Sequence, residues 1–306
     1  MIDATFLNQL KGLKFLSRKK VSSVYIGSRS SIKQGRGLEL YDHREYYAGD
    51  DFRTIDWKLY GRTEKLYIRR FEEEKDLTLH ILVDASSSMD FTTGPMKKFD
   101  YAGSIAAGFA YLGMSKYEKF APALYSSRLT EIMPPRKGKM QFFRFVSLLN
   151  EAKLSGATNL GECMNEYSSF IKTKSFLILV SDFLEPIDYI RKGIYRVARG
   201  SKEAILIQVL DPGEINLKWS DDIDFEDMES SRSEKVYLSP NFKKEYAKKF
   251  REHIFEIREI CNDTGIAFYS INTSTPLFEA FVGILEGKAG KGVFDWEKKD
   301  AAEQNI

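Results

Sequence analysis

The sequence predicts an α/β fold: a three-layer sandwich in which helices cover both faces of a mostly parallel central sheet. From residue 77 onward, short apolar runs alternate with amphipathic stretches, which is typical of βαβ units. The runs are apolar at consecutive positions, as expected for strands buried on both faces. A chain of 306 residues with 43% hydrophobic residues is also long enough to bury a substantial core.

The individual elements follow from this alternation. Five apolar runs predict strands, at residues 77–83, 120–125, 175–181, 204–210 and 266–271. Six amphipathic stretches predict helices, at residues 99–116, 140–151, 160–172, 186–199, 242–263 and 276–286. His80 lies inside the first strand, so we expect a core histidine with a satisfied ring. Cys163 and Cys261 lie in predicted helices without metal-spaced partners, so we expect buried, reduced thiols.

Two regions break the alternation and define the expected domains. Residues 1–76 form a smaller amino-terminal region, in which LYIRRFEEE predicts an edge strand or a hairpin. Residues 77–286 form the main domain, interrupted at about residues 212–240 by an acidic insertion with short strands or loops. Residues 287–306 are expected to be a mobile tail.

The charge pattern limits the classes of partner. The formal net charge of +2 is small for this length, so the sequence does not predict nucleic-acid binding. Every charged residue from Lys11 to Arg36 is basic, and residues 221–234 are mostly acidic; these runs are solvated faces or docking surfaces for a partner or an anionic membrane. No apolar run approaches the ~18 to 20 residues of a membrane span, and the start lacks a signal-peptide core. We therefore expect a cytoplasmic protein whose membrane contact, if any, is peripheral.

Polar residues follow two of the buried strands. Asp84, Ser86 and Ser88 come after the first strand in the sequence DASSSM, Thr158 precedes a helix, and Asp182 ends another strand. Because the carboxyl ends of parallel strands meet at one edge, where ligands bind at a switch in strand order, we expect these five side chains to converge. Their hard oxygen atoms suit Mg²⁺ or Mn²⁺ rather than zinc or copper. The alternative is that the serines only cap helices or form turns.

The same residues resemble a known site. Asp-x-Ser-x-Ser, the threonine in GATN and the later aspartate are similar to the metal-ion-dependent adhesion site (MIDAS) of von Willebrand factor type A (vWA) domains. The resemblance implies that Ser86, Ser88 and Thr158 touch the ion, and that Asp84 and Asp182 act through water. It also implies a Rossmann-like vWA sandwich, and a protein partner whose acidic residue completes the coordination of the metal.

A second motif resembles another family. The stretch YYAGDDFRTIDW at residues 46–57 is similar to the signature of bacterial proteins with domain of unknown function 58 (DUF 58). This resemblance implies an adaptor or assembly factor that works with a MoxR-type AAA ATPase. Many members of that family carry amino-terminal membrane helices, which this sequence does not predict.

The signature has two interpretations. In the structural one, Arg53 pairs with Asp51 or Asp56, and Trp57 belongs to the core. In the functional one, these side chains lock the amino-terminal region against the sheet and shape a docking surface for a partner.

The sequence favours a non-enzymatic interaction module. The alternative is a metal-dependent phosphohydrolase or transferase, but Ser86 stands where aspartyl phosphatases need a second aspartate, and we expect no general base or lysine beside the loop. No Ser, His and Asp set has a nucleophile elbow, and no Gly-x-Gly-x-x-Gly follows the first strand. We therefore predict a module that binds a partner carboxylate through Mg²⁺.

Overall fold

The computed structural model describes residues 6, 8–10, 39–72, 78–171, 175–215, 217, 222–226 and 233–287. The chain divides into two compact units: Tyr25–Asp76, and Met1–Val24 together with Leu77–Ile306. Phe6 belongs to the larger unit, where its ring packs edge-on against Phe281 with 5.7 Å between centroids. The basic stretch and nearly all of the expected tail lie outside the described residues, and the domain ranges expected from the sequence stay a prediction.

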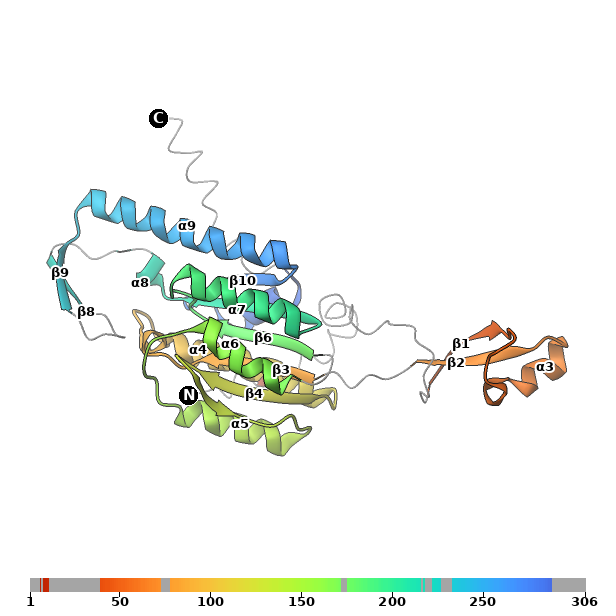
Figure 1. Ribbon diagram of the computed structural model, residues 1–306. Coiled ribbons are helices and arrows are strands. Elements are labelled where there is room, and N and C mark those ends of the chain that lie inside the picture. The colour runs from red at the N-terminus through yellow and green to blue at the C-terminus, as the bar shows by residue number, and fades with distance from the viewer. Residues whose placement is uncertain are drawn as a thin grey trace. The chain divides into compact units, whose positions relative to one another are not determined.

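The larger unit is built on a six-stranded sheet. Its strands are β3 (Thr78–Asp84), β4 (Lys119–Tyr125), β5 (Leu129–Ile132), β6 (Ser175–Ser181), β7 (Glu203–Leu210) and β10 (Ala267–Asn272). Their spatial order is β10-β7-β6-β3-β4-β5, and all neighbours are parallel except β4 and β5 (Figure 1). The mostly parallel sheet is thus confirmed. We did not expect β5, because four residues with one partly buried position carry little apolar signal.

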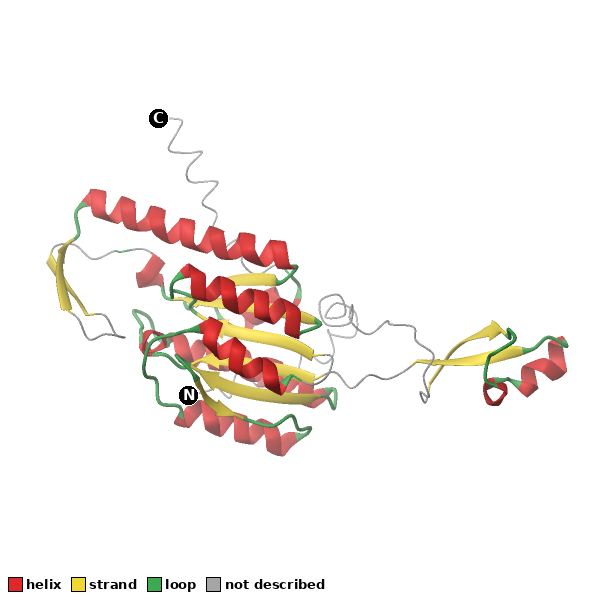
Figure 2. Cartoon of the chain, viewed as in Figure 1, coloured by secondary structure: helices red, strands yellow, loops and turns green. Residues whose placement is uncertain are grey.

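Helices form the two outer layers. They are α4 (Lys98–Ser115), α5 (Lys139–Glu151), α6 (Leu160–Tyr167), α7 (Ile187–Gly200), α8 (Pro212–Ile215), α9 (Pro240–Thr264) and α10 (Leu277–Leu285). The helices α4, α5 and α10 pack together on one side of the sheet, and α6, α7 and α9 on the other (Figures 1 and 2). Since the sheet lies between these layers, the predicted three-layer sandwich is confirmed.

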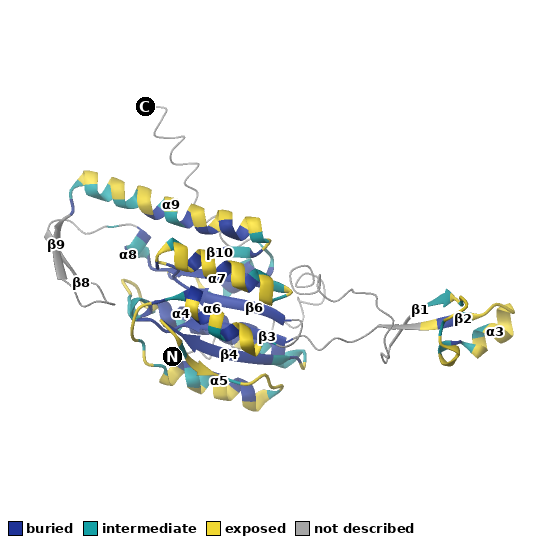
Figure 3. Ribbon diagram, viewed as in Figure 1, coloured by how far each residue is buried: buried dark blue, intermediate teal, exposed yellow. Residues whose placement is uncertain are grey.

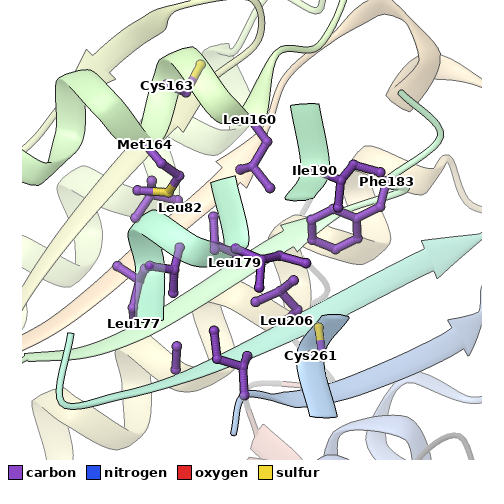
Figure 4. Packing of buried hydrophobic residues seen from close by; sticks show 14 of the residues in the cluster. Leu82, Leu160, Cys163, Met164, Leu177, Leu179, Phe183, Ile190, Leu206 and Cys261 are labelled. Atoms are coloured by element: carbon purple, nitrogen blue, oxygen red, sulfur yellow. The ribbon is translucent and has the colours of Figure 1, made fainter. Parts of the chain in front are cut away.

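The sheet is buried on both faces. All seven residues of β3 and all seven of β6 are buried, whereas the helices expose their outer faces (Figure 3). Figure 4 shows the core between the sheet and α6, α7 and α9, a cluster of buried residues that includes Leu179, Leu206 and Ile190. A Cβ at Gly193 would lie 2.5 Å from Leu160 Cγ, so glycine is needed there for α7 to approach α6.

Two expectations about core residues are confirmed. Cys163 and Cys261 are free and buried, and burial raises the pKa of each thiol to about 12. His80 is buried and its Nδ1 lies 2.8 Å from the hydroxyl of Tyr167. Burial lowers the pKa of His80 to about 4, so this histidine is a neutral core residue at physiological pH.

The order of the strands creates a switch point. From β3 the chain continues to β4 and β5 on one side, and then returns to place β6, β7 and β10 on the other side. The connections after β3 and after β6 therefore diverge at the carboxyl ends of these two adjacent strands, which is the position at which open α/β sheets bind ligands. Asp84 ends β3 and Asp182 directly follows β6, so the topology places both aspartates there.

The acidic insertion contains short elements, as expected. It begins with α8 and continues into a hairpin of β8 (Asp222–Glu226) and β9 (Ser233–Tyr237), which pair antiparallel. Tyr246 in α9 donates a hydrogen bond of 2.9 Å to the backbone oxygen of Glu214, which joins α8 to α9.

The smaller unit is a two-stranded sheet with a short helix. The strands β1 (Glu39–Glu45) and β2 (Tyr67–Glu72) pair antiparallel. The 3-10 turn η1 (Phe52–Thr54) and the helix α3 (Trp57–Thr63) connect them. The stretch LYIRRFEEE therefore supplies a strand of a paired ribbon, within the two alternatives expected from the sequence.

Candidate functional site

Asp84 is the centre of a polar cluster at the switch point. Its side chain is fully buried, and its Oδ1 accepts a hydrogen bond of 2.9 Å from the backbone N–H of Ser86. Its Oδ2 accepts hydrogen bonds from two hydroxyls, that of Ser181 at 2.6 Å and that of Thr158 at 3.3 Å. Both carboxylate oxygens are thus held, which fixes the orientation of Asp84.

The loop that follows β3 brings two more hydroxyls to the cluster. Ser86 Oγ and Ser88 Oγ lie 3.1 Å apart, and Ser88 belongs to the 3-10 turn η2 (Ser87–Asp90). Backbone hydrogen bonds tie this loop to the one before α6: Ser87 N–H donates to the oxygen of Gly156 at 3.0 Å, and Ser155 N–H donates to that of Ala85 at 3.1 Å. These bonds position Thr158 beside Asp84.

Asp182 faces the same point from the end of β6. Its Oδ1 accepts a hydrogen bond of 3.2 Å from Leu184 N–H, and its backbone oxygen accepts one of 2.8 Å from the side chain of Gln208. Phe183, which lies between Asp182 and Leu184 in the chain, is buried and has a φ of 50°. This left-handed conformation is uncommon for a residue other than glycine. The carboxylate of Asp182 also accepts a hydrogen bond from the hydroxyl of Ser88 in the loop after β3.

A buried lysine contacts Asp182. Lys98, the first residue of α4, has no exposed surface, and its Nζ lies 2.7 Å from Asp182 Oδ2 and 2.5 Å from Glu214 Oε1. The other oxygen of Glu214 accepts a hydrogen bond of 2.9 Å from the backbone N–H of Asp211. The ammonium of Lys98 is therefore shared between the end of β6 and α8.

The two aspartates differ in their electrostatics. Burial, together with the negative charge of Asp182, raises the pKa of Asp84 to about 7. Burial also acts to raise the pKa of Asp182, but the ammonium of Lys98 and its hydrogen bond outweigh burial, so the pKa of Asp182 is lowered. Asp182 is consequently ionised near neutral pH, whereas Asp84 is close to the midpoint of its titration.

The donor atoms fit a hard divalent ion. Adjacent ligands of an octahedral Mg²⁺, with bonds of about 2.0 to 2.1 Å, lie about 2.9 Å apart. The Oγ atoms of Ser86 and Ser88 are 3.1 Å apart, close to that spacing. Within the part of the chain that the structure describes, no group of three or more His, Cys, Asp or Glu side chains is placed to hold a metal. The cluster also offers the hydroxyl oxygens of Ser86, Ser88 and Thr158.

The structure brings the five residues expected at the sheet edge, Asp84, Ser86, Ser88, Thr158 and Asp182, into one cluster.

The signature residues of the smaller unit have local structural contacts. Asp51 accepts from Arg53 N–H at 3.0 Å and caps η1. Asp56 caps α3 and pairs with His43, whose Nε2 lies 2.9 Å from its Oδ2. Both aspartates thus have structural roles at the starts of short helices.

Two structural expectations for the signature are wrong. Trp57 is not a core residue, since 61% of it is exposed. Asp56 takes His43 as its partner, and residues 39–72 contain no ion pair of Arg53 with either aspartate. The reason is local: both aspartate side chains turn back to cap backbone N–H groups, and these contacts direct them away from the exposed guanidinium.

Sequence reasoning missed three residues of the cluster. Lys98 contradicts the expectation that no lysine accompanies the loop, while Ser181 and Glu214 complete the contacts of Asp84 and Lys98. One signal for Lys98 was present: a lysine in the first turn of a helix is unfavourable toward the helix dipole and calls for a compensating anion. The polar residue that closes the apolar run of β6 was a weaker signal for Ser181.

The fold and the cluster define an α/β protein with a polar site at the switch point of a parallel sheet. The chain matches the family described as "Protein of unknown function DUF58" over residues 42–256, so it belongs to that family. An uncharacterized protein of Mycobacterium tuberculosis is 24% identical over 274 residues, covering 89% of this chain and 86% of the relative. A counterpart in Mycobacterium bovis matches to the same extent.

Solved structures with some similarity were also found. The conserved hypothetical protein BatB from Bacteroides thetaiotaomicron has a TM-score of 0.45 and 13% identity, covering 69% of this chain and 96% of that one. The VWA domain of SpRpn10 also has a TM-score of 0.45, with 10% identity and coverage of 69% and 95%. Within the described residues, none of the helices combines the length and apolar character needed to cross a membrane.

Proposed function

We propose that this chain is a non-enzymatic interaction module that binds a carboxylate of a protein partner through Mg²⁺ or Mn²⁺. The observation that carries the proposal is the meeting of three hydroxyls, those of Ser86, Ser88 and Thr158, with the buried carboxylate of Asp84 at the switch point. A bound divalent ion would supply a double positive charge with one coordination position open to the partner.

The residues of the chain have distinct parts in this proposal. Ser86, Ser88 and Thr158 would offer their oxygen lone pairs to the ion. Asp84 accepts from the Thr158 hydroxyl and from Ser86 N–H, so it orients these donors. Asp182 lies beyond Ser88, whose hydroxyl bonds to it, and would act on the ion through water. The partner's acidic residue would then contribute the last oxygen.

Metal binding tests the first half of the proposal. Mn²⁺ and Mg²⁺ are titrated calorimetrically into the wild type, Ser86→Ala and Ser87→Ala. Ser87 is the matched control, because it lies in the same loop and contacts Gly156 through its backbone N–H. We expect saturable binding that is lost in Ser86→Ala and retained in Ser87→Ala. Equal binding by all three proteins would refute the assignment of the hydroxyls.

Partner binding tests the second half. The DUF 58 resemblance names a MoxR-type AAA ATPase as the partner, and an acidic residue on its surface would reach the ion. Capture of the purified ATPase should require Mg²⁺ or Mn²⁺, and should be lost with EDTA and in Ser86→Ala. Capture that is equally strong in EDTA would show that the metal does not join the two proteins.

No described feature favours the metal-dependent phosphohydrolase or transferase. The lysine that such an enzyme would use to bind phosphate is present as Lys98, but it is buried and already shared between Asp182 and Glu214. A phosphate group would therefore meet a net negative cluster and not a free cation. The proposed role is accordingly in binding.

A further inference from the structure

Lys98 is an uncommon component of the site. A lysine without exposed surface is rare unless it is paired, and this one has carboxylate partners at 2.7 and 2.5 Å. It begins α4, where the positive end of the helix dipole disfavours a cation. The chain thus keeps a cation in an unfavourable place, where two carboxylates compensate it.

The contact also affects the proposed metal site directly. Asp182 Oδ2, which Lys98 binds, belongs to the carboxylate that would act on the ion through water. Two carboxylates, those of Asp182 and Glu214, share this one ammonium. A fixed positive charge so close to the site repels a divalent cation and engages one of its anions.

We propose that Lys98 is a fixed internal cation that competes with the divalent ion for Asp182 and so weakens metal binding by the chain alone. This inference rests on the proposed metal site and names how that site is regulated. Glu214 opposes Lys98, because it draws the ammonium toward α8 and away from Asp182. A partner carboxylate would then be needed to restore the negative charge that Lys98 cancels, which makes tight metal binding depend on the partner.

The two residues give predictions of opposite sign. Lys98→Met removes the competing cation and leaves Asp182 free, so the dissociation constant for Mn²⁺ should fall at least tenfold. Glu214→Gln removes the second partner of Lys98 and strengthens the contact between Lys98 and Asp182, so this constant should rise severalfold. A purely structural role would loosen the site in both variants and weaken binding in both.

Calorimetric titration with Mn²⁺ separates these cases. The series is the wild type, Lys98→Met, Glu214→Gln and the control Lys249→Met, which removes a lysine from an exposed pair with Glu245. Circular dichroism and a cooperative melt in EDTA establish that each variant is folded. If Lys98→Met does not fold, the double variant Lys98→Met/Glu214→Gln is used in its place, because it removes one charge of each sign. We expect this double variant to bind Mn²⁺ more tightly than wild type.

The outcomes are distinct. Tighter binding without Lys98, weaker binding in Glu214→Gln and no change in Lys249→Met support the inference. If the folded Lys98 variants bind Mn²⁺ as tightly as wild type or more weakly, the inference is overturned. The proposed function would still stand in that case, provided that metal binding depends on Ser86. Absence of binding in every protein, with partner present or absent, overturns the proposed function and the inference together.

Discussion

The strongest prediction concerns the stability of the metal-free protein when Asp84 is replaced by asparagine. Asparagine keeps the shape of the side chain, and its oxygen can still accept from Ser86 N–H. Its NH₂ group would face the hydroxyls of Ser181 and Thr158, which can act as acceptors. The substitution therefore removes a buried charge and leaves the hydrogen-bonding pattern satisfiable.

The magnitude follows from the pKa of Asp84, which is raised from 3.8 to about 7 in the folded protein. Well below pH 3.8 the carboxyl is protonated in both the folded and the unfolded chain, and its burial costs no ionisation free energy. Between about pH 4 and 7 the folded state holds more protons, so the free energy of unfolding falls by up to about 1.4 kcal/mol per pH unit. The full cost at pH 8 is about 4 kcal/mol, an upper limit because water that enters the site relieves part of the desolvation.

Urea denaturation in EDTA, followed by circular dichroism from pH 4 to 8, measures this effect. Asp84→Asn should be more stable than wild type at pH 8, and the difference should shrink to a small part of its pH 8 value at pH 4. Asp182→Asn is the control of opposite sign, because the pKa of Asp182 is lowered by Lys98, and its removal should destabilise the protein at pH 8. The reasoning is refuted if Asp84→Asn is destabilising at pH 8, or if its effect does not vary with pH.

Three further substitutions test the packing around the site and the smaller unit. Ser181→Ala should lower the free energy of unfolding, measured by urea denaturation, by about 1 to 3 kcal/mol, because it leaves a buried oxygen of Asp84 with fewer hydrogen-bond donors. The control Ser169→Ala, at an exposed position, should change this free energy by less than about 0.5 kcal/mol. Gly193→Ala should lower the free energy of unfolding by about 1 to 3 kcal/mol, since the new Cβ would lie 2.5 Å from a side-chain carbon of α6. Gly103→Ala is the matched control, because the atom nearest to its new Cβ would lie 3.5 Å away. Equal melting temperatures of the two variants would contradict the tight packing at Gly193. Trp57→Ala should leave the melting temperature within about 2 °C of wild type, as befits a side chain that is 61% exposed, and a large loss would show that this ring is covered.

The sequence alone determined the class of fold and the position of the site along the chain. Uninterrupted apolar runs such as 175–181 required strands buried on both faces, and these occur in parallel sheets covered by helices. Polar residues that directly follow such runs had to lie at the carboxyl edge. The convergence of Asp84, Thr158 and Asp182 could therefore be expected before their contacts were known.

The tertiary structure decided which charges meet at that edge. Lys98 and Glu214 are separated along the chain from both aspartates, and nothing in their local sequence specifies the distance of 2.7 Å from Lys98 to Asp182. The same applies to the exposure of Trp57, because an aromatic residue in a short helix is core or surface according to what packs against that helix. Periodicity reports which side of an element is apolar, whereas pairing between distant side chains depends on strand order and helix placement, which are set by the packing of the whole chain.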